Sequence, residues 1–323
     1  MRFGAFVPQG WRMDLVDIPV EEQWGAMVSV ARTAEEAGFD SVWVYDHFHT
    51  VPRPSQQSTF ECWATMAGLA AATRRVRLGQ MVTCNSYRHP SYLAKASASI
   101  DVMSQGRLEF GIGAGWYEHE YLAYGYRFPK PSVRIGMMEE GVRIIKAMWT
   151  EDQASFEGRH YSVQGAINRP KPLQKPHPPV WIGGGGEQLT LRVVAEQADF
   201  SNFGAGNLEV FGHKSQVLER HCRQAGRDPA EIGRSSSFDC LIAASEDQVE
   251  RALRALPPNF GDPERFRARA LVGTPEQVVE QLRRWDEAGC AYAIVYFADA
   301  LQGVGMRLFG EQVIPKLSAD AVR

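Results

Sequence analysis

Apolar and polar residues follow one another along this chain in two different rhythms. Eight short runs are almost continuously apolar, as expected of strands buried on both faces, and they cover residues 2–8, 41–48, 76–83, 107–115, 179–185, 198–203, 235–244 and 291–297. In the longer stretches between them, apolar residues recur every three or four positions, which predicts amphipathic helices at 21–39, 60–73, 90–103, 132–149, 187–198, 207–225, 246–256 and 275–288. A terminal helix is predicted to begin near Gly305.

The order of strand then helix, repeated eight times, predicts a closed (β/α)₈ TIM barrel rather than an open doubly wound sheet. Residues 150–178 interrupt this order with several prolines and no sustained period, which indicates a surface excursion with room for a small hairpin. No stretch has the composition of a linker. We therefore expect one barrel domain over residues 1–323, with an insertion segment at about 150–178.

Composition and charge narrow the range of partners and compartments. With 35 Lys and Arg against 38 Asp and Glu, the net charge is -3, which gives no support for nucleic acid or a membrane surface as partner. No apolar run approaches the roughly 20 residues needed to span a bilayer, and the N-terminus lacks the pattern of a secretory signal. Five scattered cysteines with no C-x-x-C pair favour reduced thiols in the cytoplasm.

The fifth predicted strand ends in four consecutive glycines, after which a helix is predicted to begin. They are Gly183, Gly184, Gly185 and Gly186. In a (β/α)₈ barrel the active site lies at the carboxyl ends of the strands, and a phosphate site is often built near the later ones. Backbone without Cβ atoms can bring its N–H groups together on an anion, helped by the positive end of a following helix. The run therefore predicts a phosphate-binding loop.

A second glycine cluster, GIGAGWYEHE, begins at Gly111. It fits the dinucleotide fingerprint G-x-G-x-x-G only in part, because Trp116 stands at the last glycine and the aromatic residues that follow do not begin a clear helix. A Rossmann site is therefore disfavoured. In a barrel, a strand tipped by Gly113 and Gly115 and followed by Trp116 is better suited to the close approach of a flat ring system.

The stretch YDHFHT places Asp46 and His47 at the end of the second strand, and so at the barrel mouth. Histidine exchanges protons near neutral pH, so His47 is a candidate proton donor or acceptor, and we expect Asp46 to fix its tautomer. The pair His47 and His49 also suggests a metal-dependent hydrolase on the same barrel. That class needs further ligands at later strand ends, where Asp299 is the supporting carboxylate.

Six segments together resemble a known superfamily over nearly the whole chain. They are MRFGAFVPQGW, WVYDHFHTVP, VRLGQMVTCNSYRHPSYLAK, GRLEFGIGAGWYEHEYLAYG, PPVWIGGGGEQLTLRVVAEQADFSNF and LVGTPEQVVEQLRRW. The chain is similar to the luciferase-like flavin/deazaflavin oxidoreductases, and within them to the F420-dependent oxidoreductases of actinobacteria. The resemblance implies a barrel with a cofactor at its mouth, hydride transfer to or from a small-molecule organic substrate, and commonly a homodimer.

The resemblance also assigns roles to particular residues. It implies that Asp46 and His47 lie beside the reactive ring carbon. Our own hypothesis adds that Trp116 and Phe48 shape the apolar pocket for the substrate. It implies a non-prolyl cis peptide within the stretch Gln80, Met81, Val82 and Thr83, behind the ring. Gly113 and Gly115 would approach the ring or its ribityl chain, and Gly184, Gly185 and Gly186 would hold the phosphate. One departure is Trp116, which stands where the sugar-phosphate dehydrogenases of the F420 branch have a glutamate; Glu118 and Glu120 are near but do not match.

The identity of the cofactor separates the remaining alternatives. F420 implies a reductase or dehydrogenase, FMN implies a monooxygenase fed by a separate reductase, and a protein that binds the ring without turnover is a third possibility. The polyanionic tail of F420 calls for basic residues at the mouth, for which the candidates are Arg88, Arg127, Lys130, Arg134, Arg159, Arg169 and Lys171.

Overall fold

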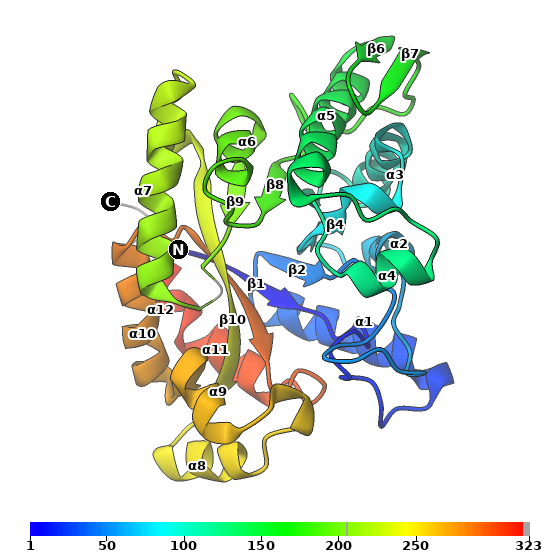
Figure 1. Ribbon diagram of the computed structural model, residues 1–323. Helices are drawn as coiled ribbons and strands as arrows, with labels where there is room; N and C mark the ends of the chain where they lie inside the picture. The colour runs from blue at the N-terminus through cyan, green and yellow to red at the C-terminus, as the bar shows by residue number, and fades with distance from the viewer. Residues whose placement is uncertain (205, 319–323) are drawn as a thin grey trace.

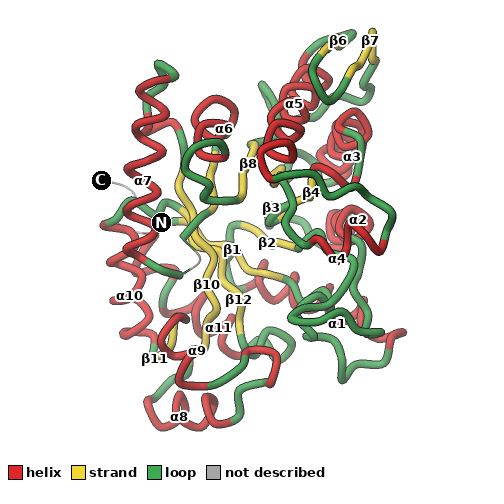
Figure 2. Tube along the Cα trace, viewed as in Figure 1, coloured by secondary structure: helices red, strands yellow, loops and turns green. Residues whose placement is uncertain are grey.

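Eight parallel strands close into a barrel in the computed structural model, which describes residues 1–204 and 206–318 (Figures 1 and 2). In order around the barrel they are β1 (Arg2–Phe6), β2 (Ser41–Val44), β3 (Arg77–Gln80), β5 (Leu108–Gly113), β8 (Val180–Gly183), β9 (Phe200–Asn202), β10 (Gly233–Ile242) and β12 (Tyr292–Phe297). The ring closes because β12 pairs with β1, with Arg2 beside Tyr292. The predicted TIM barrel is thus confirmed.

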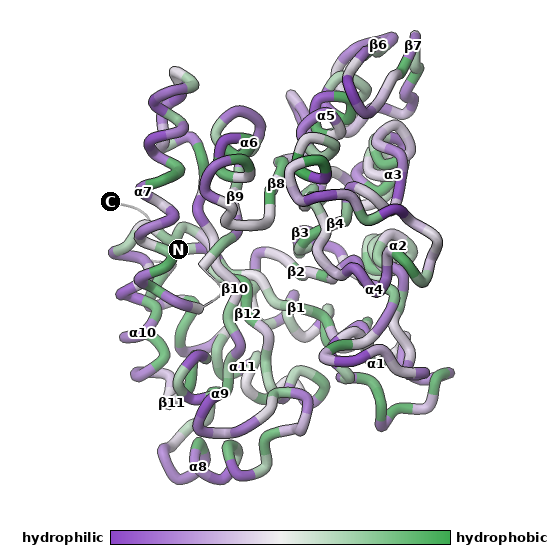
Figure 3. Tube along the Cα trace, in the orientation of Figure 1, coloured by the Kyte–Doolittle hydropathy of each residue, from purple (hydrophilic) through white to green (hydrophobic). Residues whose placement is uncertain are grey.

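Helices surround the strands, as Figure 2 shows in red around yellow. They are α1 (Val20–Glu36), α2 (Cys62–Ala72), α3 (Pro90–Met103), α5 (Pro131–Thr150), α6 (Thr190–Gln197), α7 (Leu208–Gln224), α8 (Glu246–Arg254), α10 (Pro275–Glu287), α11 (Val304–Gln312) and α12 (Ile314–Ser318). In Figure 3, β8 and β12 are mainly in hydrophobic colours, whereas the outer helix α7 carries hydrophilic turns. None of the helices described in residues 1–204 and 206–318 is both long enough and apolar enough to cross a bilayer.

Several elements differ from the sequence prediction. The third strand is interrupted after Gln80 and resumes as β4 (Thr83–Cys84), and the segment after β5, where no helix was predicted, forms α4 (Glu118–Ala123). A helix α9 (Pro263–Arg269) and a strand β11 (Leu271–Gly273) precede α10, and β11 extends the sheet beside β10. Within the excursion, β6 (Ala154–Glu157) and β7 (Ser162–Ala166) form an antiparallel hairpin beside α5 (Figure 1). The domain limits expected from the sequence include residues 205 and 319–323, which lie outside the described residues.

Large aromatic side chains fill the interior of the barrel. Trp43 and Trp181 pack edge to face with ring centroids 4.8 Å apart. A Cβ atom on Gly4 or Gly79 would come within 2.4 Å of the Trp43 ring, so only glycine leaves room for it. The interior is therefore a packed core, and open space for a ligand begins above it, at the carboxyl ends of the strands.

The small residues of α2 have a role in the barrel wall. A Cβ atom on Gly68 would lie 2.4 Å from the Trp24 ring of α1, so the glycine lets the two helices pack closely. This small residue therefore serves packing between neighbouring helices of the barrel wall.

Candidate active site

A cavity of about 390 Å³ opens at the carboxyl ends of β2, β3, β5 and β8. It brings together residues that are far apart in the sequence but were predicted for one site: Asp46, His47, Met81, Val82, Thr83, Gly113, Gly115, Trp116 and Gly184. Gln80, Gly185, Gly186 and Phe48 are not part of its lining. Most of the site residues predicted from the sequence therefore line the cavity, and the remaining four lie beside or behind its wall.

The floor of the cavity is formed by the interrupted third strand. The peptide bond between Met81 and Val82 is cis, within the stretch named from the sequence. Gln80 lies behind it, fully buried, and its side-chain oxygen accepts a hydrogen bond from Gly111 N (3.1 Å). A Cβ atom on Gly113 would meet Val82 Cγ2 at 2.5 Å, so glycine at this position makes room for the valine as well as for a ligand.

Asp46 is buried away from His47 and is bonded to other groups. Its carboxylate accepts hydrogen bonds from Thr83 Oγ1 and Cys84 N, each at 2.8 Å, and pairs with both Nη atoms of Arg88 at 2.6 and 2.9 Å. The expectation that Asp46 fixes the tautomer of His47 is therefore wrong. The reason is that Arg88, 42 residues further on, takes both carboxylate oxygens.

The partner of His47 is Glu120, which the sequence placed nearby but gave no role. His47 Nδ1 and Glu120 Oε2 are 2.8 Å apart, and the same oxygen accepts the hydroxyl of Tyr87 at 2.8 Å. The other oxygen accepts the N–H groups of Phe48 and His49. With Nδ1 bound to a buried carboxylate, Nε2 is the ring nitrogen left to exchange a proton at the cavity.

The electrostatics of this pair favour an ionised glutamate. Burial raises the pKa of Glu120, but the hydrogen bond and charge of His47, together with the His49 N–H and the Tyr87 hydroxyl, lower it by more. The pKa of Glu120 therefore lies below its ordinary value of 4.5. Trp11 stacks on the imidazole with centroids 4.3 Å apart and planes at 6°, which fixes the ring orientation.

Replacing Glu120 with glutamine is expected to destabilise the fold by about 1–3 kcal/mol at pH 7, because one oxygen acceptor is replaced by a donor facing buried donors. The folded-state pKa of Glu120 is lowered, so the stabilisation by its charge is complete above pH 4.5 and is lost as pH falls through that lower pKa. Urea unfolding between pH 7 and pH 3 should show the variant and the wild type converging in acid. Glu118→Gln, an exposed change on the same helix, is the matched control, and an equal loss in that control would contradict the assignment.

The glycine run forms a loop with unused backbone donors. Gly184 has φ +118°, a conformation that favours glycine, and its N–H donates to the Asn202 carbonyl at 3.0 Å. The N–H groups of Gly185 and Gly186 donate to no residue within the described ranges. The helix expected to begin at 187 starts at Thr190, so a turn separates the run from α6.

Lys214 of α7 is a basic residue beside this loop that the sequence analysis missed. A Cβ atom on Gly185 would lie 3.6 Å from the Lys214 side chain, whose Nζ is 2.5 Å from Glu187 Oε1. Of the basic residues named from the sequence, Arg134 lines the cavity, whereas Arg88 is held by Asp46 and Arg169 pairs with Asp152. Lys171 donates to backbone carbonyls of Met148 and Glu151.

Residues 1–204 and 206–318 contain no group of three or more His, Cys, Asp or Glu side chains that could hold a metal ion. The ring centroid of His49, in the loop after β2, lies 5.0 Å from that of His119, in the first turn of α4.

Comparison with known proteins agrees with this geometry. Residues 1–264 match the luciferase-like monooxygenase family. The F420-dependent glucose-6-phosphate dehydrogenase of Nocardia farcinica (strain IFM 10152) is 28% identical over 334 residues, covering 93% of this chain and 96% of the relative. The enzyme of the same name from Amycolatopsis mediterranei (strain U-32) is 26% identical over 329 residues, covering 92% and 96%.

Two solved structures share the fold over almost their whole length. The monooxygenase RslO1 from Streptomyces bottropensis superimposes with a TM-score of 0.80 at 25% identity, covering 98% of this chain and 99% of that one. An F420-dependent secondary alcohol dehydrogenase in complex with an F420-acetone adduct gives 0.79 at 23% identity, covering 97% and 98%, and this likeness concerns the fold. The barrel and its mouth are those of a luciferase-like protein. The chain belongs to the luciferase-like monooxygenase family.

Proposed function

We propose that the protein is an F420-dependent oxidoreductase that transfers a hydride between the deazaflavin and a small organic substrate. We call the glycine run at 183–186 the phosphate-type loop. The proposal rests on one observation: Gly184 of this loop and His47, which is bonded to Glu120, line the same cavity. The relatives from Nocardia farcinica and Amycolatopsis mediterranei, each matched over 96% of its length, are named as F420-dependent dehydrogenases, which supports this cofactor.

The residues present fit such a group at both of its ends. The backbone donors of Gly185 and Gly186, with Lys214 close by, suit a phosphate. Gly113, Gly183 and Val82 form a cavity wall from which few side-chain atoms project, and such a flat wall suits a planar ring.

When bound, the deazaflavin supplies the two-electron chemistry of hydride transfer. The chain would hold the phosphate end at the glycine loop and place the ring against the Val82 wall. His47 would hold or release the accompanying proton at Nε2, with Glu120 fixing the other ring nitrogen. Trp11 and Trp116, at ring distances of 4.3 and 5.7 Å from His47, would limit the access of water to that nitrogen.

Titration of the purified protein with F420 and with FMN, followed by fluorescence, tests the proposal. Tight F420 binding with weak FMN binding is expected. The opposite preference would replace the proposal by its alternative, an FMN-dependent monooxygenase; the Streptomyces relative is named as a monooxygenase. Binding of F420 without reduction of any carbonyl, imine or enone would point instead to a cofactor-binding protein without turnover.

Replacing Gly185 with aspartate is expected to weaken F420 binding by about tenfold or more, because a carboxylate would face the phosphate and compete for Lys214; tenfold corresponds to about 1.4 kcal/mol. Gly185→Ala is the matched control, since its Cβ would make ordinary contacts at 3.6 Å with Lys214 and Phe203. The titration above measures both. Undiminished affinity in the aspartate variant would show that the phosphate binds elsewhere.

We also infer a cytoplasmic homodimer. The five cysteines are unpaired and buried, as suits a reducing compartment, and members of this family were expected from the sequence to pair. Light scattering that gives a monomer mass would contradict the dimer.

A further inference from the structure

A second cavity, of about 350 Å³, adjoins the first at the barrel mouth. Trp11 and Tyr45 line both cavities, so they form the boundary between them. The remaining wall of the second cavity combines aromatic rings, among them Phe6 from β1 and Tyr296 from β12, with polar and charged side chains. Because the two cavities share these two rings, a planar molecule packed along Trp11 and Tyr45 would contact both cavities.

Two arginines converge on one carboxylate in this second cavity. Arg12 makes a two-pronged contact with Asp239, with its Nη atoms 2.6 and 3.3 Å from the two oxygens, and Arg269 donates to the same carboxylate. All three side chains line the cavity. Two guanidinium groups against one carboxylate leave one positive charge without a counter-charge in the lining.

Several donors on these two arginines find no partner among the described residues. A guanidinium has five N–H donors. Arg12 donates to Asp239, interacts with the Tyr45 hydroxyl and lies 4.2 Å from the Tyr296 ring centroid. Arg269 donates to Asp239 and to the Phe260 carbonyl at 3.1 Å. The Arg12 side chain is 17% exposed, so its remaining donors are largely withdrawn from bulk water. A sheltered guanidinium with unused donors is a strong site for an oxyanion.

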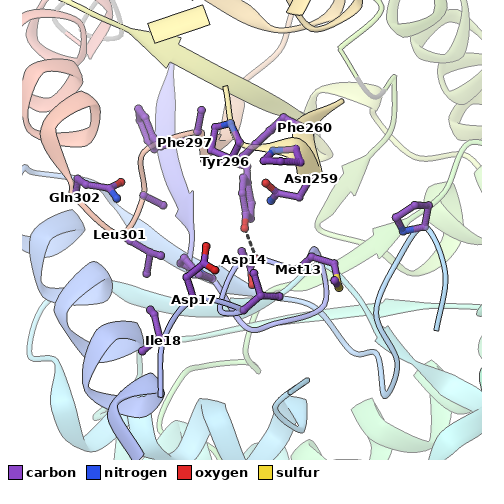
Figure 4. Close-up of a pocket in the computed structure, with 17 residues that line it drawn as sticks. Met13, Asp14, Asp17, Ile18, Asn259, Phe260, Tyr296, Phe297, Leu301 and Gln302 are labelled. Atoms are coloured by element: carbon purple, nitrogen blue, oxygen red, sulfur yellow. Dashed lines mark hydrogen bonds between the residues drawn. The ribbon is translucent and has the colours of Figure 1, made fainter. Parts of the chain in front are cut away.

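The neighbouring carboxylate, Asp14, does not bond to either arginine. It accepts the Tyr296 hydroxyl, the bond drawn as a dashed line in Figure 4, and the Gly10 N–H at 2.6 Å. It faces a separate cavity of about 560 Å³, shown in Figure 4, which no arginine lines. Burial raises the pKa of Asp14, which reduces its ability to compensate the charge of Arg12.

We propose that the second cavity binds an anionic group of the substrate, a carboxylate or a phosphate on a planar body, through Arg12 and Arg269, while the reacting carbon lies in the first cavity beside His47. This inference rests on the proposed function, because it assigns the substrate of that same site. It names the substrate class that the F420 assignment leaves open. The two oxyanions share the chemistry of guanidinium recognition, and the probes below distinguish them.

Calorimetric binding of three small probes, benzoate, phenyl phosphate and the uncharged benzamide, tests the proposal on the protein with and without F420. At least one anionic probe is expected to bind about tenfold or more tightly than benzamide. Arg269→Gln should remove most of that preference and leave benzamide unchanged. Preference for benzoate or for phenyl phosphate would identify the group.

Asp239→Asn should change the affinity for the anionic probe in the direction opposite to Arg269→Gln. With the competing carboxylate neutralised, both arginines become available, so the anionic probe should bind more tightly than to the wild type. A purely structural role for Asp239 would weaken binding instead. Arg267→Gln is the matched control, since Arg267 pairs with Glu250 on the surface and does not line this cavity.

The outcomes separate the two proposals. Equal binding of benzoate, phenyl phosphate and benzamide, with no change in either variant, would overturn the anion site even if F420 binds. Weaker F420 binding in Arg269→Gln, with unchanged probe binding, would assign the arginines to the coenzyme tail and also overturn it. Anion preference in a protein that binds no F420 would support the site while contradicting the proposed function.

Discussion

Replacing His47 with asparagine is expected to lower turnover by about 10²- to 10⁴-fold, the range typical for loss of a positioned proton donor or acceptor. The imidazole has one nitrogen bound to Glu120 and a face stacked on Trp11, so Nε2 is held in one place. Asparagine can keep a hydrogen bond to Glu120 but has no titratable nitrogen to present. Steady-state kinetics on any substrate found active, with F420 fluorescence for affinity, measures both effects.

The affinity for F420 should change far less than turnover in this variant. The phosphate-type loop at Gly184, Gly185 and Gly186 follows β8, whereas His47 follows β2, so the two contribute to binding separately. His119→Asn is the matched control, because this imidazole is exposed and does not line the cavity. Unchanged turnover in His47→Asn, or a loss of affinity as large as the loss of turnover, would remove His47 from its assigned role.

The barrel could be predicted because its two periodicities are physical requirements. Strands covered on both faces must be apolar throughout, and helices that cover them must be apolar on one side. The boundaries could not be predicted so well. The interruption between Gln80 and Thr83 and the turn from Glu187 to Leu189 depend on tertiary contacts, and β11 is too short to give a periodic signal.

The sequence predicted where the site lies better than it predicted which side chains bond to one another there. The strand ends that carry His47, Gly113 and Gly184 meet because parallel strands of a barrel all end at one mouth. Asp46 and His47 are consecutive in the loop that follows β2, and the sequence does not show which groups their side chains meet there. Both residues line the cavity, but the Asp46 carboxylate bonds to Arg88 whereas the His47 ring bonds to Glu120.

Contacts between distant segments account for the residues that were missed. Glu120 could be distinguished from Glu118 only by the helix α4, which buries one and exposes the other. Lys214 and Arg269 lie in segments whose sequence carries no motif, and they reach the mouth because the barrel brings α7 and α9 beside it.

Replacing Asp46 with asparagine is expected to lower the free energy of unfolding by about 3–5 kcal/mol, as for other buried ion pairs that lose one partner. The change keeps the shape of the side chain but leaves Arg88, 11% exposed, without its two-pronged partner. It also weakens the acceptor for Thr83 and Cys84, which line the cavity. Urea unfolding at pH 7 measures the loss.

Glu61→Gln provides the matched control, because Glu61 is the outer partner of the same arginine and its side chain is 42% exposed. Exposed ion pairs contribute about 1 kcal/mol or less, so this variant should lose far less stability than Asp46→Asn. Equal losses of unfolding free energy in Asp46→Asn and Glu61→Gln would mean that solvent reaches Asp46. The pair of Asp46 with Arg88 would then not hold the segment after β3. If Asp46→Asn alone is destabilised, Asp46 holds Thr83 and Cys84 in place through its buried pair with Arg88, and its effect on turnover should follow the loss of folded protein.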